Sequence, residues 1–156
     1  MGEIFFYHLT RQPVEQALPQ LLQRARDAGW RVAVRGGSQE RLNWLDEKLW
    51  LQEGFLAHGV AGTGFDADQP ILLTLGAPEN GAECLVSFDG AEVSETDVAG
   101  MTRTMIVFNG HDDAAVQTAR GQWKALTEAG AAAQYWSQES GSWEMKRKHP
   151  PEGGVI

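Results

Sequence analysis

Cations and an aromatic ring near residue 120 form the part of the sequence best suited to bind another molecule. Arg120, Trp123 and Lys124 are spaced so that they share one flank if this segment is helical. Val116 and Thr127 fall on the same flank. Arginine takes a carboxylate through two parallel hydrogen bonds, lysine adds a point charge, and an indole can wall an apolar slot. The pattern indicates a receptor for an acidic chain with an apolar end. An indole that only completes the core, beside two solvated cations, is the simpler interpretation of this helix taken alone.

The other reactive residue types do not form a catalytic or metal site. The histidines at positions 8, 58, 111 and 149 are scattered, without the spacing of zinc ligands. Cys84, the only cysteine, lies in an apolar run and not at an electropositive helix start that would activate its thiol. The sequence has neither a Gly-x-Ser-x-Gly elbow nor a Gly-Lys-Ser/Thr phosphate-binding motif. We therefore expect no metal and no cofactor, and we assign no catalytic residue.

A glycine-rich segment at residues 58–64 was compared with the phosphate-binding loops of nucleotide-binding proteins. Gly59, Gly62 and Gly64 reverse the spacing of the dinucleotide-binding fingerprint, and no clear helix follows, so a structural loop is favoured over a phosphate cradle. Because α/β domains host many activities, a nucleotide-binding α/β enzyme is the alternative function. A third hypothesis is direct binding of single-stranded nucleic acid through the basic C-terminal residues and exposed tryptophans.

The composition is that of one acidic domain. A chain of 156 residues with 42% hydrophobic content is long enough for one sizeable core and too short for two ordinary domains. The net charge of −8 argues against direct binding to duplex DNA. The first residues are not a basic leader, no segment approaches the roughly 20 apolar residues that span a bilayer, and a single cysteine suits a reducing compartment. We expect a cytoplasmic protein without membrane contact.

Hydrophobic periodicity predicts alternating strands and helices. Apolar runs typical of strands lie at residues 4–8, 31–34, 71–75, 84–88 and 104–108, with shorter ones at 55–57 and 134–137. The first helix begins near Val14, contains Pro19 as a predicted kink, and stops at Gly29. The second is capped by Ser38 and turns inward Leu42, Leu45 and Leu49. This order predicts a single α/β domain with a mostly parallel central sheet flanked by helices.

The last helix and the C-terminal residues complete the predicted domain. Asn109 or Asp112 caps a helix that runs to Ala129, with a core face made of Ala115, Ala119, Leu126 and Ala129. Trp143 is expected to pack back onto the domain, which covers residues 1–145. The remaining stretch has basic residues followed by Pro150-Pro151-Glu152-Gly153-Gly154, which cannot bury enough apolar area to offset its ordering entropy. We predict a flexible tail at residues 146–156.

Several short motifs resemble the chi subunit family of bacterial DNA polymerase III, in that family's order and over nearly the whole chain. They are Phe6-Tyr7-His8-Leu9, Gly29-Trp30-Arg31-Val32, Leu45-Asp46-Glu47-Lys48-Leu49-Trp50, Phe55-Leu56-Ala57-His58, Ala61-Gly62-Thr63-Gly64, Pro70-Ile71, Arg120-Gly121-Gln122-Trp123-Lys124 and Ala129-Gly130. Each motif is weak alone, and together they are fairly specific. The resemblance implies a Rossmann-like fold without a phosphate-binding loop, and a clamp-loader accessory subunit without catalytic activity.

The resemblance also implies two partners. Chi proteins capture the acidic C-terminal tail of single-stranded DNA-binding protein, and Arg120, Trp123 and Lys124 match the basic and aromatic positions used for this. Trp123 stands where family members commonly have tyrosine, which keeps the aromatic wall and loses any hydroxyl contact. We expect the tail's terminal apolar side chain to pack near Trp123 and Val116.

A separate surface in the family binds the small psi subunit. The matching segment here contains Trp50, Phe55 and His58, for which simple hydrophobic packing is the alternative. Psi does not accompany every chi-like protein, so another clamp-loader component or a chi-associated helicase can take its place.

Overall fold

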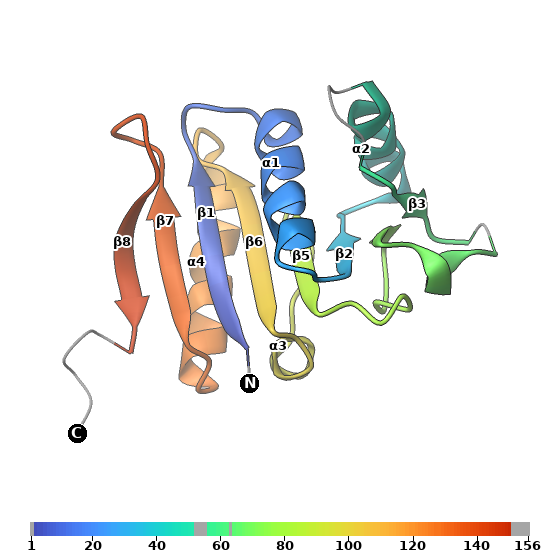
Figure 1. Ribbon diagram of the computed structural model, residues 1–156. Coiled ribbons are helices and arrows are strands. Elements are labelled where there is room, and N and C mark those ends of the chain that lie inside the picture. Colours follow the sequence, from blue (N-terminus) through green and yellow to red (C-terminus); the bar gives the residue numbers. More distant parts are fainter. Residues whose placement is uncertain (1, 52–55, 63, 151–156) are drawn as a thin grey trace.

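The computed structural model describes residues 2–51, 56–62 and 64–150, which form a three-layer α/β/α domain (Figure 1). The strands are β1 (Glu3–Leu9), β2 (Val32–Arg35), β3 (Gly59–Val60), β4 (Ile71–Thr74), β5 (Cys84–Phe88), β6 (Arg103–Asn109), β7 (Ala133–Ser137) and β8 (Glu144–His149). The helices are α1 (Val14–Asp27), α2 (Gln39–Leu51), α3 (Glu95–Ala99) and α4 (Asp113–Glu128), with a short 3-10 turn at Asp66–Asp68. The predicted fold class is confirmed.

One sheet carries the described strands in the order β3-β4-β2-β5-β6-β1-β7-β8. Every neighbouring pair is parallel except β7 and β8, which are antiparallel. All residues of β4 and β5 are buried, as expected for central strands covered on both faces. The sequence prediction of these strands as continuous apolar runs is therefore confirmed.

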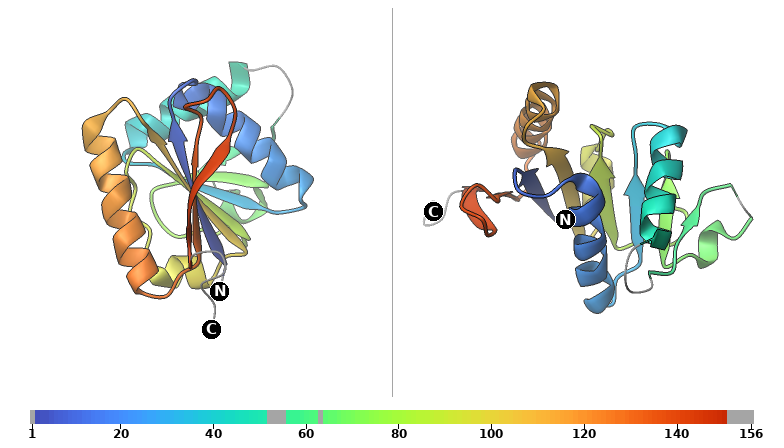
Figure 2. Two further views of the ribbon diagram at one scale, coloured as in Figure 1. Left: turned by 90° about the vertical axis from the view of Figure 1, so that its left-hand side faces the viewer. Right: turned by 90° about the horizontal axis from the view of Figure 1, so that it is seen from above.

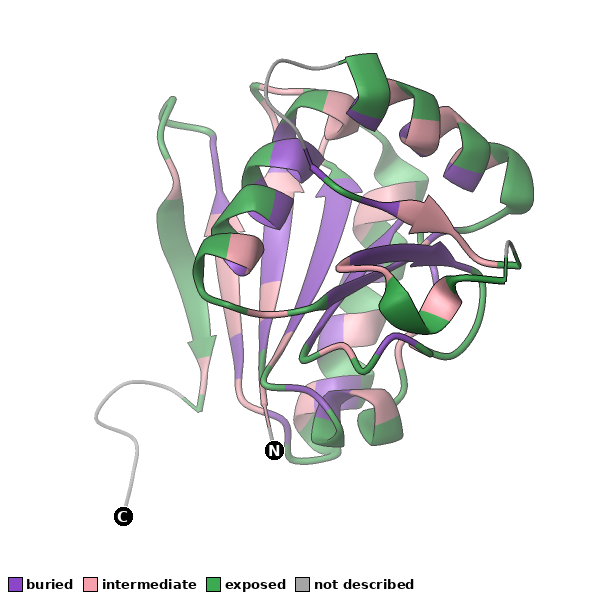
Figure 3. Cartoon of the chain, turned by 45° about the vertical axis from the view of Figure 1, so that its right-hand side comes forward, coloured by how far each residue is buried: buried purple, intermediate pink, exposed green. Residues whose placement is uncertain are grey.

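The two faces of the sheet are covered by different helices (Figure 2). On one face α1 and α2 bury the larger core cluster, which includes the predicted Leu42, Leu45 and Leu49. On the other face α3 and α4 cover a second cluster around Ile4, Phe6 and Ile106. Figure 3 shows the purple buried residues on the inward faces of the helices and along the central strands. The side chains of β1 alternate between these clusters because successive residues of a strand point to opposite faces.

Local signals set the bounds of α4. The side chain of Asp112 accepts hydrogen bonds from the backbone N–H groups of Ala114 and Ala115, at 3.0 and 3.3 Å, so Asp112 is the helix cap. Gly130 follows the helix with a φ of 101°, a left-handed conformation that glycine adopts without steric cost. Both features agree with the sequence prediction, which left Asn109 and Asp112 as alternative caps.

Helix α3 was not predicted, although the sequence contains the residues of its capping box, Ser94 and Asp97. The hydroxyl of Ser94 accepts a hydrogen bond from the Asp97 backbone N–H, and the Asp97 carboxylate accepts one from the Ser94 N–H. Asp97 also forms an ion pair with Arg35 at 2.8 Å. Burial alone would raise the pKa of Asp97, but its hydrogen bonds with Arg35 and Ser94 outweigh that effect and lower it. This network fastens α3 to the end of β2.

Two predictions about chain segments are corrected. Residues 146–149, assigned to a flexible tail, lie in β8 and pair with β7, while residues 151–156 lie outside the described residues. The charged side chains of this strand give no apolar periodicity, so the sequence did not predict it. An edge strand needs no apolar face of its own once its backbone is hydrogen-bonded to a neighbour. The short third strand is at Gly59–Val60 and not at 55–57, of which residue 55 lies outside the described residues and 56–57 are not in a strand.

Candidate functional site

An open groove of about 770 Å³ lies between α4 and the C-terminal strands, on the α4 face of the sheet. Helix α4 packs behind β6 and β1, while β7 and β8 extend the sheet beyond it (Figures 1 and 2). The first wall of this α4–β8 groove is the exposed side of α4 from Arg120 to Glu128, and the second is formed by Lys146, Arg147 and His149 of β8. His8, Tyr135 and Ser137, from β1 and β7, also line it.

Aromatic rings form the floor of the α4–β8 groove. Trp123 is only 8% exposed and packs edge-on against Phe6, with 5.3 Å between ring centroids. Tyr135 lies 6.1 Å from Trp123 and 6.4 Å from Phe6 by the same measure. The Tyr135 hydroxyl is 2.7 Å from Nδ1 of His8, so the floor carries one polar pair. A ligand side chain resting here would meet mainly apolar ring surface.

Cations surround this floor. Arg120 and Lys124 are exposed and stand one helical turn apart on α4. Within residues 2–51, 56–62 and 64–150 neither side chain has a hydrogen-bond or ion-pair partner. The groove also contains the carboxylates of Glu128 and Glu139, which offset part of the positive charge. The two α4 cations are therefore available to an anionic ligand.

Burial keeps the two polar groups of the floor uncharged near neutral pH. Loss of hydration lowers the pKa of His8, although a hydrogen bond with the Gly110 backbone and the charge of Glu139 act in the opposite direction. Burial likewise raises the pKa of Tyr135, with Arg120 acting against it. The Tyr135 hydroxyl therefore stays protonated, and no phenolate opposes an incoming acidic chain.

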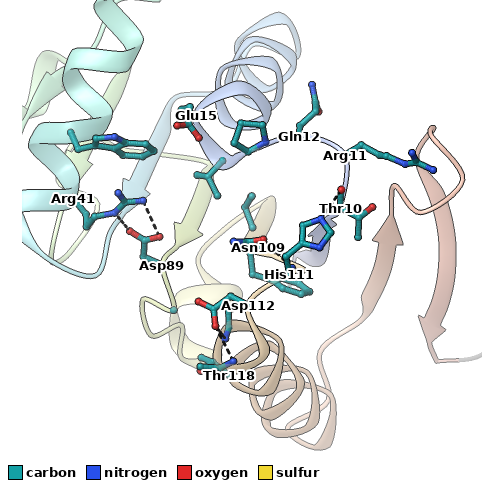
Figure 4. Close-up of a pocket in the computed structure, with 18 residues that line it drawn as sticks. Thr10, Arg11, Gln12, Glu15, Arg41, Asp89, Asn109, His111, Asp112 and Thr118 are labelled. Atoms are coloured by element: carbon teal, nitrogen blue, oxygen red, sulfur yellow. Dashed lines mark hydrogen bonds and ion pairs between the residues drawn. The ribbon is translucent and has the colours of Figure 1, made fainter.

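A second hollow lies at the carboxyl ends of the central strands, where doubly wound α/β proteins bind nucleotides (Figure 4). Two of its polar groups already have partners: Arg41 forms an ion pair with Asp89, and the carboxylate of Asp112 accepts from the first N–H groups of α4. A phosphate at the start of α4 would have to displace the Asp112 carboxylate, so this end of the hollow is a poor nucleotide site.

The glycine-rich segment is not a phosphate cradle either. Gly59 belongs to β3, and the backbone N–H of Gly62 donates to both carboxylate oxygens of Asp66 at 3.1 Å. The interpretation as a structural loop agrees with this pairing. Among the described residues, no three His, Cys, Asp or Glu side chains gather as metal ligands. Nor does that part of the chain contain a helix with the length and apolarity needed to span a bilayer.

Comparison with known proteins identifies the family. No curated protein sequence matches the chain. The family model described as DNA polymerase III chi subunit, HolC, matches residues 1–134, which is most of the 156-residue chain. The chain belongs to the DNA polymerase III chi subunit family. It is therefore an accessory subunit of DNA polymerase III with a role in DNA replication, and the resemblance seen in the sequence is confirmed.

In this chi-family chain the predicted peptide-binding residues are only partly placed as expected. Arg120, Trp123 and Lys124 line one groove. However, Trp123 lies on the core face of α4 with Ala119 and Leu126, and not on an outer flank, while Ala129 is exposed. The ring is 8% exposed, so only a small part of it reaches the groove. Val116 is half-buried against the core and does not line the groove.

The segment predicted to contact a second partner has mixed exposure in the chi-family fold. Trp50 is 56% exposed and Leu51 80%, at the end of α2. His58 is buried, and its Nδ1 and Nε2 atoms lie 2.7 Å from the Leu56 carbonyl oxygen and 2.9 Å from Asp46. Its ring lies 4.5 Å from that of Trp50. The buried ring of His58 thus packs against the exposed indole of Trp50. Phe55 lies outside the described residues.

The groove contains residues that the sequence did not single out. His8 comes from β1, far in the sequence from Tyr135 of β7 and Arg147 of β8, and the sheet order brings all three beside α4. The basic run at residues 146–149 indicated a positively charged surface, but it was predicted to be part of a flexible tail and so was not included in the predicted site.

Proposed function

We propose that this chi-family chain is a non-catalytic, cytoplasmic adaptor of the clamp loader that binds the acidic C-terminal tail of single-stranded DNA-binding protein. The observation that carries the proposal is the pair of α4 cations, Arg120 and Lys124, whose side chains have no partner in the described part of the chain, beside an aromatic floor. Carboxylates of the tail pair with the cations, and its terminal apolar side chain rests on Trp123 and Tyr135. The adaptor thereby links the DNA-coating protein to the replisome.

The attraction is local, because the whole chain is acidic. At physiological ionic strength charges are screened over about 8 Å, so the net charge of −8 acts weakly on a ligand already within the groove. Added salt weakens binding, since part of the affinity comes from exposed ion pairs.

We further propose that the exposed end of α2, around Trp50 and Leu51, contacts the second partner. Both are large apolar side chains on the surface, at the opposite end of the sheet from β8. Psi, another clamp-loader component or a chi-associated helicase can fill this role. The separation between the two surfaces allows one adaptor to hold both partners at once.

Calorimetric titration with the isolated acidic tail peptide tests the main proposal. Binding is expected, and removal of the peptide's last apolar residue weakens it about tenfold or more, because burial of one large side chain is worth about 1.5–3 kcal/mol. A peptide of the same composition in scrambled order is the control. Absence of binding by the native peptide, or equal affinity for the shortened one, contradicts the proposal.

A further inference from the structure

Strand β8 follows the residues that match the chi family, which end at 134. Its sequence, Glu-Met-Lys-Arg-Lys-His, is the most basic run of the described chain. Three of its residues, Lys146, Arg147 and His149, line the α4–β8 groove. Resting on the function proposed above, we propose that β8 is a second cationic wall that binds the acidic stretch preceding the apolar end of the same tail peptide.

An irregularity in strand pairing aims two successive cations into the groove. Met145 pairs with Trp136, but the next pair joins Arg147 to Tyr135, so Lys146 is an extra residue in β8. In a regular strand Lys146 and Arg147 would point to opposite faces of the sheet. A bulge of this kind bends the strand and redirects a side chain, which explains why both residues line the groove. Lys148, one position further, does not line it.

Arg147 is held in place by the aromatic floor. Its guanidinium carbon lies 5.3 Å from the centroid of the Trp123 ring, within the range of a cation–π contact. A guanidinium in a cation–π contact still has N–H groups free to take a carboxylate through two hydrogen bonds. In the described part of the chain no acidic side chain is paired with Arg147, whereas Lys146 already pairs with Glu144 at 3.0 Å. Arg147 is thus the principal contact of this wall.

Positive charge on both sides of the groove suits a ligand with several acidic groups. Arg120 and Lys124 project from α4, and Arg147 approaches the same indole from β8. An extended peptide can present successive side chains to opposite sides, so carboxylates along it would meet α4 and β8 in turn. Glu128 and Glu139 also line the groove, and Glu144 pairs with Lys146. These carboxylates weaken the attraction of the groove for anions, so that a ligand must contact the cations directly to bind. The wall therefore favours a run of carboxylates over a single terminal one.

Titration of the acidic tail peptide into full-length variants tests this inference. Arg147→Glu weakens binding about tenfold or more, because a charge-assisted hydrogen bond is worth about 1.5–3 kcal/mol. Lys148→Glu makes the same charge change at the next position, outside the groove, and keeps affinity within about twofold. Arg147→Lys retains the positive charge but loses the two parallel N–H donors of arginine, so its affinity for the peptide is expected to lie between those of the two glutamate variants. Thermal unfolding of each variant verifies the fold.

The outcomes separate this inference from the proposed function. If the unmodified chain binds the peptide and Arg147→Glu behaves like Lys148→Glu, β8 has no part in binding, whereas the α4 site stands. If the unmodified chain does not bind the peptide, both proposals fall. A single-stranded oligonucleotide is titrated in parallel. Should Arg147→Glu weaken oligonucleotide binding and leave the peptide unaffected, β8 is a nucleic-acid contact and the inference is overturned.

Discussion

Replacing Arg120 and Lys124 together by glutamate is expected to abolish measurable binding of the acidic tail peptide. Each cation contributes about 1.5–3 kcal/mol through charge-assisted contacts, so the loss of both weakens binding about 100-fold or more. The new carboxylates also repel the ligand. Both residues are exposed on α4 and lack partners in the described structure, so the substitutions leave the fold intact. Calorimetry gives the affinity, and circular dichroism verifies the helix content.

A matched control separates the effect of where the charges lie from the effect of the change in net charge. Arg24→Glu with Lys148→Glu makes the same change in net charge at exposed positions on α1 and β8 that do not line the α4–β8 groove. This double variant is expected to bind the peptide within about threefold of the unmodified chain, because screening limits distant charges. Equal affinity of the two double variants would show that the peptide does not use α4.

Truncation of the groove floor has the second large effect. Trp123→Ala is expected to lower the free energy of unfolding by about 3–5 kcal/mol, because it removes a large buried ring from the core. The ring is 8% exposed and contacts Phe6 and Tyr135, which would face the cavity left behind. Urea unfolding followed by circular dichroism measures the change.

Trp123→Tyr separates packing from binding. A tyrosine keeps an aromatic ring at this position, so it is expected to retain peptide binding and to recover much of the stability lost in the alanine variant. An alanine variant as stable as the unmodified chain to within about 0.5 kcal/mol would mean that the indole is not a packed core residue.

The fold could be predicted from the sequence where burial dictates the pattern. The fully buried, mainly apolar strands β4 and β5 and the inward leucines of α2 follow directly from a sheet covered on both faces. Helix α3 was missed because it is only five residues long, although Ser94 and Asp97 form its capping box. Strand β8 was missed because its side chains are polar and its pairing with β7 is a backbone property that side-chain periodicity does not report.

The site could be predicted only as far as one helix defines it. The spacing of Arg120 and Lys124 placed both cations correctly on an exposed side of α4. The direction of Trp123 could not be found in the same way, since it depends on the packing of its ring against Phe6 of a distant strand. The contact between His8 and Tyr135 joins residues 127 positions apart and depends entirely on the neighbouring places of β1 and β7 in the sheet.

The location of the bound peptide is the central claim, and the indole N–H signals of the ¹⁵N-labelled chain report it most directly. The chain has six tryptophans, whose signals are assigned by single replacements with phenylalanine. Trp44, in the hollow at the carboxyl ends of the strands and beneath Arg41, is the internal reference. The account predicts that the acidic tail peptide shifts the Trp123 signal and leaves that of Trp44 in place. A shift of Trp44 with Trp123 unchanged would contradict it.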